Sequence, residues 1–158
     1  MSIRIPLTTV LDYNDSGNVG ATSIVNKTFF IPQDTDQVMV KVPVASIVGG
    51  DPIVNVFFQT TDDGGTTWYD LANLRLPNTT AGSILGNNNA TARWVNIPTT
   101  RAANSVVSAQ ASSLGANQVS GLPVMSQLNR ISIQYLGTIT TNNGVQVQVK
   151  TGQQSATA

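Results

Sequence analysis

The residues best suited to catalysis or binding lie in one short stretch, TTDDGGTTWYDL at residues 60–71. Glycoside hydrolases use carboxyl groups in pairs, so the neighbouring Asp62 and Asp63 raise the question of catalysis. Such a pair needs two carboxyl groups in a cleft, one of them usually with a raised pKa. All the aspartates except Asp70 lie in or beside turn-like sequence, without the apolar neighbours that raise a carboxyl pKa. We therefore expect no catalytic residues and no enzymatic activity.

A structural turn explains the same stretch. Thr61, Asp63, Gly65, Thr67 and Trp68 have the spacing of an Asp-box, and they resemble the turn that recurs in the propeller blades of sialidases. In such a turn the Asp side chain accepts hydrogen bonds from backbone amides, Gly takes a positive φ and Trp packs behind the turn. The pattern occurs once, whereas a propeller needs several copies and a far longer chain. The prediction is a structural turn that joins two strands.

Oxygen-rich stretches raise the separate possibility of calcium binding. DYNDSGN places Asp12, Asn14 and Ser16 at alternate positions before Gly17, as at the start of an EF-hand loop. The twelfth position of that loop would be Ser23, where a bidentate glutamate is needed. The aspartates of PQDTDQ (residues 32–37) fit capped turns equally well. We predict no metal site and no cofactor, and a structural calcium ion is the alternative.

Cysteine and histidine are both absent. Their absence excludes disulfides, thiolate nucleophiles, a Ser-His-Asp triad and zinc sites built on Cys or His. The glycine pairs Gly49-Gly50 and Gly64-Gly65 are not followed by the Lys-Ser/Thr of a phosphate-binding loop.

Charged residues make up 10% of the 158 residues, against the usual quarter or so, and the formal net charge is zero. The basic residues are dispersed, so we expect no nucleic-acid partner. The N-terminal MSIRIPLTTV has no long apolar segment, so we expect no signal peptide, and no apolar run approaches about 18 residues, so we expect no membrane span. A surface rich in Thr, Asn, Ser and Gln loses little free energy when it is desolvated. Such a surface favours contact with partner proteins or with further copies of the chain.

The alternation of apolar and polar residues predicts strands throughout. QVMVKVPVA at residues 37–45 places four valines on one face, and Pro43 predicts that this strand is an edge or carries a bulge. A similar run at 53–59 follows the turn-like Gly49-Gly50-Asp51-Pro52, so we predict an antiparallel hairpin. RISIQYLG and VQVQVK, separated by Asn143-Gly144, predict a second hairpin near the C-terminus. Weaker strands are predicted at 3–11, 24–31, 67–73 and 92–97.

These elements predict an all-β domain, an antiparallel two-layer β-sandwich with a jelly roll favoured over an immunoglobulin-like topology. Residues 1–20 are expected to form an N-terminal arm or a first strand, residues 21–150 the single domain, and residues 151–158 a flexible tail. Within the domain we expect long loops at 77–91 and 101–123, with one short helix near 103–113.

Four aromatic residues offer a different kind of function. Trp68, Tyr69, Trp94 and Tyr135 are types that line carbohydrate-binding grooves, although packing in a sandwich core also accounts for such residues. A carbohydrate-binding β-sandwich module, for adhesion or as a tail or fibre component, is therefore the alternative function.

Two portions of the chain, residues 36–76 and 128–150, resemble small virion proteins of tailed bacteriophages. The resemblance lies in the alternating valine strand, in VNVFFQTTDDGGTTWYDL and in the closing RISIQYLGTITTNNGVQVQVK. Such proteins typically carry an Arg followed by alternating β-branched residues in the last hairpin, as Arg130, Ile131 and Ile133 do here. The resemblance implies a capsid decoration (cement) protein or a related head or tail component, commonly a β-sandwich and often a trimer.

The functional expectation is a non-enzymatic structural protein located in the virion. Its partners would be the major capsid protein or other virion proteins, and its own copies in a homo-oligomer, with a trimer favoured. The residues expected to make these contacts lie in the N-terminal arm and in the 101–123 loop: Ile3, Arg4, Ile5, Arg101, Leu114, Val119 and Leu122.

Overall fold

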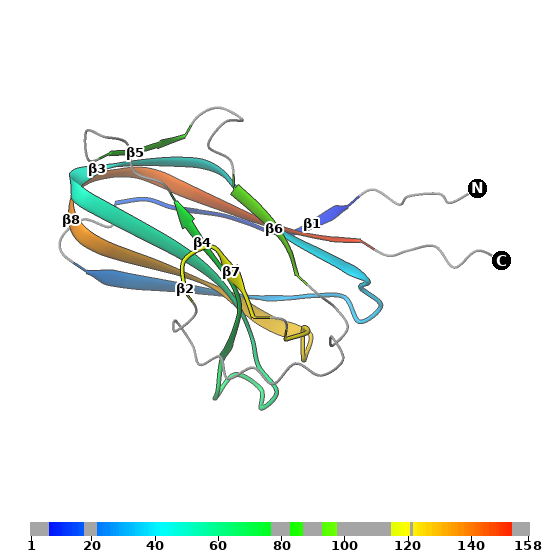
Figure 1. Cartoon of the computed structure of the whole chain (residues 1–158). Helices are drawn as coiled ribbons and strands as arrows, with labels where there is room; N and C mark the ends of the chain where they lie inside the picture. The colour runs from blue at the N-terminus through cyan, green and yellow to red at the C-terminus, as the bar shows by residue number, and fades with distance from the viewer. Residues whose placement is uncertain are drawn as a thin grey trace.

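The computed structural model describes residues 7–17, 22–76, 83–86, 93–97, 115–120 and 122–152. Within these ranges the chain forms strands and no helix, so the all-β prediction is confirmed (Figure 1). The strands are β1 (Thr8–Asp15), β2 (Ser23–Phe30), β3 (Gln37–Thr60), β4 (Tyr69–Leu76), β5 (Ser83–Gly86), β6 (Arg93–Ile97), β7 (Gln118–Val119) and β8 (Leu128–Gly152).

The long strands β3 and β8 form the frame of the fold. They pair antiparallel from Gln37 opposite Gly152 to Thr60 opposite Asn129, and the ribbon bends sharply at one end of the molecule (Figure 1). The bend divides one continuous sheet into two halves. The first half contains β1, the later part of β8, the earlier part of β3, and β5 and β6. The second half contains β2, the earlier part of β8, the later part of β3, β4 and β7.

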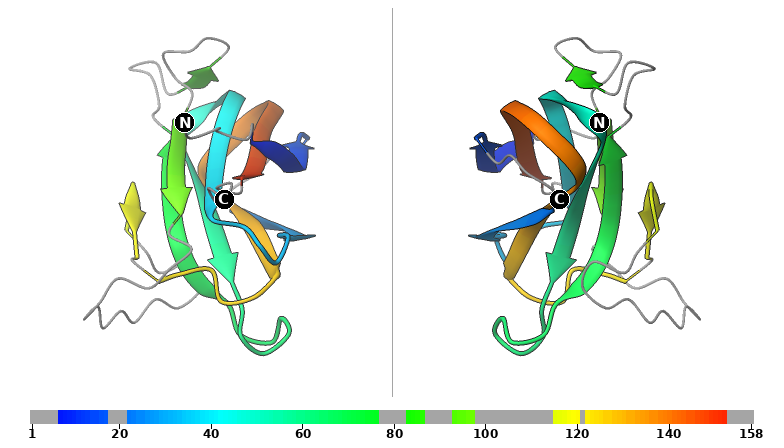
Figure 2. Two further views of the ribbon diagram at one scale, coloured as in Figure 1. Left: turned by 90° about the vertical axis from the view of Figure 1, so that its right-hand side faces the viewer. Right: turned by 90° about the vertical axis from the view of Figure 1, so that its left-hand side faces the viewer.

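The two halves face each other around one core, which confirms the predicted two-layer antiparallel architecture. Figure 2 looks along the strands and shows β4 and β6 on one side of the molecule and β1 and β2 on the other. At the side of β1 and β2, the Lys27 ammonium lies 5.4 Å from the centre of the Tyr13 ring and links the two edge strands. The preference for a jelly roll over an immunoglobulin-like topology stays a prediction.

Both predicted hairpins are wrong. Residues 38–41 pair with 148–151, and residues 38–42 pair with 93–97. Residues 54–58 pair with 131–135 and 72–76, so the two parts of β3 do not pair with each other. In β8, likewise, the Asn143-Gly144 signal lies inside one 25-residue strand. The turn-like residues of both strands instead lie where the β3–β8 register shifts, at residues 46–53 of β3 and 136–144 of β8. The reason is that β3 and β8 are partners over their whole length, so each turn signal becomes a bend shared with the other strand.

A bulge at Pro43 is confirmed. The β3–β8 register shifts between Lys41 and Val44, because proline has no N–H with which to continue the ladder. The shift changes which residues point inwards: Val42 is buried before the bulge and Ala45 after it.

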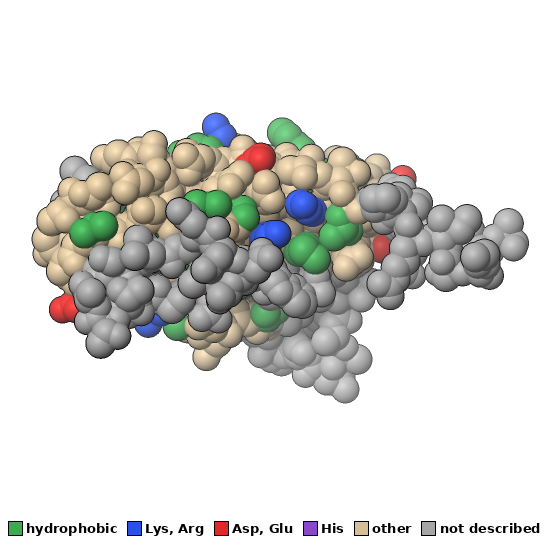
Figure 3. Space-filling view, turned by 90° about the horizontal axis from the view of Figure 1, so that it is seen from above, with side chains coloured by type: hydrophobic (Ala, Val, Ile, Leu, Met, Phe, Trp, Pro, Cys, Tyr) green, Lys and Arg blue, Asp and Glu red, His purple; other side chains and the backbone are tan. Residues whose placement is uncertain are grey.

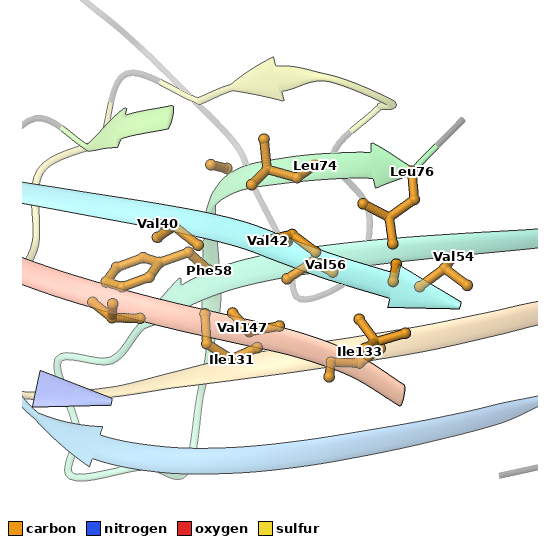
Figure 4. Packing of buried hydrophobic residues seen from close by; sticks show 14 of the residues in the cluster. Val40, Val42, Val54, Val56, Phe58, Leu74, Leu76, Ile131, Ile133 and Val147 are labelled. Atoms are coloured by element: carbon orange, nitrogen blue, oxygen red, sulfur yellow. The ribbon is translucent and has the colours of Figure 1, made fainter. Parts of the chain in front are cut away.

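The core consists of aliphatic and aromatic side chains from both halves, most of them valine and isoleucine (Figure 4). Val40 and Val42 of the first half pack with Val56 and Phe58 of the second, and all four are at most 2% exposed. Burial alternates along residues 37–42, as the sequence pattern predicts for a strand with one face in the core, whereas residues 54–60 are buried without alternation.

Several predicted boundaries change in the structure. β1 begins at Thr8 and ends at Asp15, later than the strand expected at 3–11, and β8 includes the first two residues of the expected tail, where Thr151 is buried. The expected loop 77–91 contains β5, and the expected loop 101–123 contains β7, which pairs with β4. The helix expected near 103–113 lies outside the described residues.

Candidate functional site

The Asp-box turn follows β3 and leads into β4, and five short hydrogen bonds hold it. Asp63 Oδ1 accepts hydrogen bonds from the backbone N–H of Thr66 at 2.9 Å and of Thr67 at 2.8 Å. Thr61 Oγ1 donates to Asp63 Oδ1 at 2.8 Å and accepts from the N–H of Gly65 at 3.0 Å. Gly65 has φ +101°, and its carbonyl accepts the indole N–H of Trp68 at 2.9 Å. Each residue type in the pattern thus performs the role that the sequence predicted for it.

The hydrogen bonds of this turn also set its electrostatics. Hydrogen bonds lower the pKa of Asp63 to about 2. The largest cause is the hydrogen bond from the backbone N–H of Thr67, and the side chains of Thr67 and Thr61 and the backbone N–H of Thr66 add to it. The Asp63 carboxylate is exposed and its oxygens serve the turn. A general acid needs a raised carboxyl pKa, whereas the pKa of Asp63 is lowered. The carboxylate of Asp63 therefore fits a structural role in the turn.

Behind the turn, three polar side chains form a row across β8, β3 and β4, with Gln59 and Asp70 buried and Arg130 half-buried. The Arg130 Nε–H donates to Gln59 Oε1 at 2.5 Å, and Gln59 Nε2–H donates to Asp70 Oδ1 at 2.7 Å. Gln59 and Asp70 are both 0% exposed. The Arg130 guanidinium lies 4.4 Å from the centre of the Trp68 ring, so the row is also joined to the Asp-box turn. Burial lowers the pKa of the Arg130 guanidinium, while the charge of Asp70 acts in the opposite direction.

A parallel row lies four residues away on β8 and β3 and five residues away on β4. Arg75 Nε–H donates to Asn55 Oδ1 at 2.9 Å, and Asn55 Nδ2–H donates to Gln134 Oε1 at 3.1 Å. Both rows fix the register of β8, β3 and β4 by hydrogen bonds rather than by apolar packing. The sequence reasoning missed both rows, since their members are spread over about 80 positions and only strand pairing brings them together.

A second buried cluster joins the end of β1 to β8. The Tyr135 hydroxyl donates to Asp15 Oδ2 at 2.6 Å, and the Tyr13 hydroxyl donates to Asp15 Oδ1 at 3.1 Å. Burial raises the pKa of the Tyr135 hydroxyl far above its ordinary value, and the hydrogen bond to Asp15 and its charge add to this rise. Tyr135 therefore stays protonated and remains a donor to Asp15.

Asp12, the first residue of the EF-hand-like stretch, is hydrogen-bonded to side-chain amides. Asp12 accepts hydrogen bonds from Gln146 Nε2 at 2.7 Å and from Gln148 Nε2 at 3.1 Å. Within the described ranges, no three His, Cys, Asp or Glu side chains come together in a group that could hold a metal ion.

Two of the aromatic residues considered for carbohydrate binding, Tyr135 and Trp68, are buried. Tyr135 is 1% exposed in the core, and Trp68 is 9% exposed against Arg130. Tyr69 is half-buried at the start of β4, and the side chain of Trp94 lies outside the described part of the structure. Neither Tyr135 nor Trp68 presents an open ring face for a sugar.

Two of the predicted contact residues can be placed. Val119 is exposed on β7, whereas Leu122 is half-buried and packs against the core. The other five, Ile3, Arg4, Ile5, Arg101 and Leu114, lie outside the described residues. Leu122 belongs to a segment, residues 122–127, that we call the closing segment. It passes β3, where Met125 N–H donates to Thr60 Oγ1, and reaches the end of β2, where Ile31 N–H donates to the carbonyl of Gln127.

The open edge of the sheet at β2 is the feature that sequence reasoning did not locate. Within the described structure β2 pairs only with β8, so its other edge carries backbone groups without a strand partner. Ile24 is 52% exposed and Phe30 is 70% exposed on this strand. On the face seen from above in Figure 3, the charged side chains of the described residues are few and scattered.

The fold and these sites define the chain as an all-β, two-layer protein with an open antiparallel sheet. Comparison with protein-family models, curated proteins and solved structures gives no match to this chain. No helix among the described residues is long and apolar enough to cross a membrane.

Proposed function

We propose that this chain is a non-enzymatic structural protein of a bacteriophage particle, most specifically a decoration protein that stabilises neighbouring capsid subunits. Its partners are the major capsid protein or other virion proteins, and its location is the virion. The observation that carries the proposal is the open β2 edge with two large exposed apolar side chains, in a chain whose net charge is zero.

Such an edge is suited to assembly for a physical reason. Unpaired backbone N–H and C=O groups along an edge strand are a template for another chain, and proteins that remain single normally protect them. β2 carries one charge, Lys27, and its ammonium lies over the Tyr13 ring. The other side chains along this edge are uncharged, so a partner covers it with little cost of charge desolvation.

The resemblance of residues 36–76 and 128–150 to phage virion proteins supports the same function. The described residues give no independent support to the carbohydrate-binding alternative, because Tyr135 and Trp68 are buried.

Two measurements test the proposal. Mass spectrometry of purified particles of the phage that encodes this chain is expected to find the chain in a constant ratio to the capsid protein. Particles produced without the chain are expected to release their genome at a lower temperature. Absence of the chain from washed particles would overturn the proposal, and specific binding on a glycan array with Trp68→Ala as control would favour the alternative.

A further inference from the structure

A small pocket lies between the closing segment and the residues that follow β2. Its volume is about 260 Å³, below the range of roughly 300–1,000 Å³ usual for small-molecule sites. Ile31, Pro32, Val38, Val124 and Met125 provide its apolar lining, and the remaining lining residues are uncharged. A pocket of this size and character suits one apolar side chain better than a whole ligand.

Phe30 is a side chain of that kind, and it stands immediately before the pocket residue Ile31. It is 70% exposed, the most exposed of the large hydrophobic residues in the described structure. Its neighbour Phe29 points into the core, with its ring centre 5.7 Å from that of Phe58. The alternation of the strand thus directs Phe30 outwards. Aromatic residues that fill a partner's pocket are the usual anchors of protein interfaces.

One end of the molecule therefore carries both a projecting aromatic side chain and a pocket that fits one. Identical copies carry identical charges, so a contact between copies is penalised wherever a charged group faces itself. Among the described residues no charged side chain lines this pocket, and Lys27 is the one charged residue of β2, where Ile24, Asn26 and Thr28 are exposed and uncharged. We infer that Phe30 of one copy inserts into the Ile31–Met125 pocket of a second copy, and that this contact drives self-association of the chain. The inference does not depend on the phage assignment.

Sedimentation velocity of the full chain from about 1 µM to about 1 mM tests the contact. The wild type is expected to associate over this range, and Phe30→Ser is expected to weaken association by about ten-fold or more. Ile24→Ser is the matched control, because it removes another exposed apolar side chain from the same strand. It should change association by less than about three-fold. Both positions are exposed, so circular dichroism should show the fold unchanged.

A charge pair tests the two sides of the contact together. Phe30→Lys and Met125→Asp are each expected to abolish association, since each buries a single charge. The double variant is expected to recover it, because the new lysine of one copy then meets the new aspartate of the other. The main chain of Met125 keeps its hydrogen bond to Thr60 in all variants.

Three results would overturn the inference. The first is a wild type that stays monomeric throughout the range, and the second is an Ile24→Ser effect equal to that of Phe30→Ser. The third is a Phe30→Ser effect without any effect of Met125→Asp, because the aromatic side chain would then not occupy this pocket. A monomeric chain that still requires Phe30 to enter virions would show that Phe30 contacts a different protein, and would leave the proposed function standing.

Discussion

At the scale of single residues, Asp63 shows how one carboxylate organises a turn. Its folded pKa of about 2 lies below the ordinary 3.8, so its stabilising contribution is present above pH 4 and is lost as the pH falls through about 2. Asp63→Ala removes the acceptor of two backbone N–H groups. We expect faster amide hydrogen exchange at Thr66 and Thr67 in this variant near pH 7, measured by NMR.

Asp63→Asn is the control for that prediction, because its amide oxygen still accepts hydrogen bonds but carries no charge. Its exchange rates should lie between those of the wild type and Asp63→Ala near pH 7. Equal exchange in all three proteins would show that the Asp63 side chain does not hold the turn.

Tyr135 makes the shortest hydrogen bond to the buried Asp15, at 2.6 Å. Tyr135→Phe keeps the ring and leaves one carboxyl oxygen without this donor, so we expect a loss of about 1.5–3 kcal/mol in the free energy of unfolding. Urea denaturation measures the loss. Tyr13→Phe, with a longer bond of 3.1 Å at a half-buried position, should cost less than about 1.5 kcal/mol. A larger effect at Tyr13 than at Tyr135 would contradict this reading of the cluster.

At the scale of elements, the bend of the β3–β8 ribbon depends on two adjacent glycines in different ways. A Cβ at Gly49 would lie 1.9 Å from the carbonyl oxygen of Thr138, whereas at Gly50 the nearest atom is 3.9 Å away. Gly49→Ala therefore forces the two strands apart, at a cost of about 2–3 kcal/mol or more. Gly50→Ala should be neutral within about 0.5 kcal/mol, or slightly stabilising because it restricts the unfolded chain.

Thermal and urea unfolding of these two variants measure the difference directly. Equal stability of Gly49→Ala and Gly50→Ala would mean that the strands do not approach each other as closely at the bend as the structure shows.

At the scale of the whole molecule, the near absence of charge has a consequence for association. With zero net charge and an uncharged pocket, self-association should change by less than about three-fold between 0.05 and 0.5 M NaCl, because there is little Coulomb energy to screen. Sedimentation velocity at the two salt concentrations measures this. A ten-fold weakening at high salt would indicate that charged side chains carry the contact instead of Phe30.

The sequence determined those features that depend on neighbouring residues. Strict alternation at 37–42 places these residues in a strand with one face in the core, because side chains of a strand alternate between its two faces. The run at 54–58 was also predictable as a strand, although the structure buries all five of its residues. The Asp-box turn was equally predictable, since Asp63 and the amides that it binds lie within four residues.

The tertiary structure alone decided which strands became partners. Gly49-Gly50-Asp51-Pro52 and Asn143-Gly144 have the composition of hairpin turns, yet each lies in a long bent strand, because β3 and β8 gain more pairing with each other than either could gain by folding on itself. The row Arg130–Gln59–Asp70, the Asp15–Tyr135 bond and the pocket beside Phe30 all follow from that pairing. Local sequence fixes whether a segment forms a strand or a turn, but contacts between residues 70 to 120 positions apart depend on the global pairing of strands.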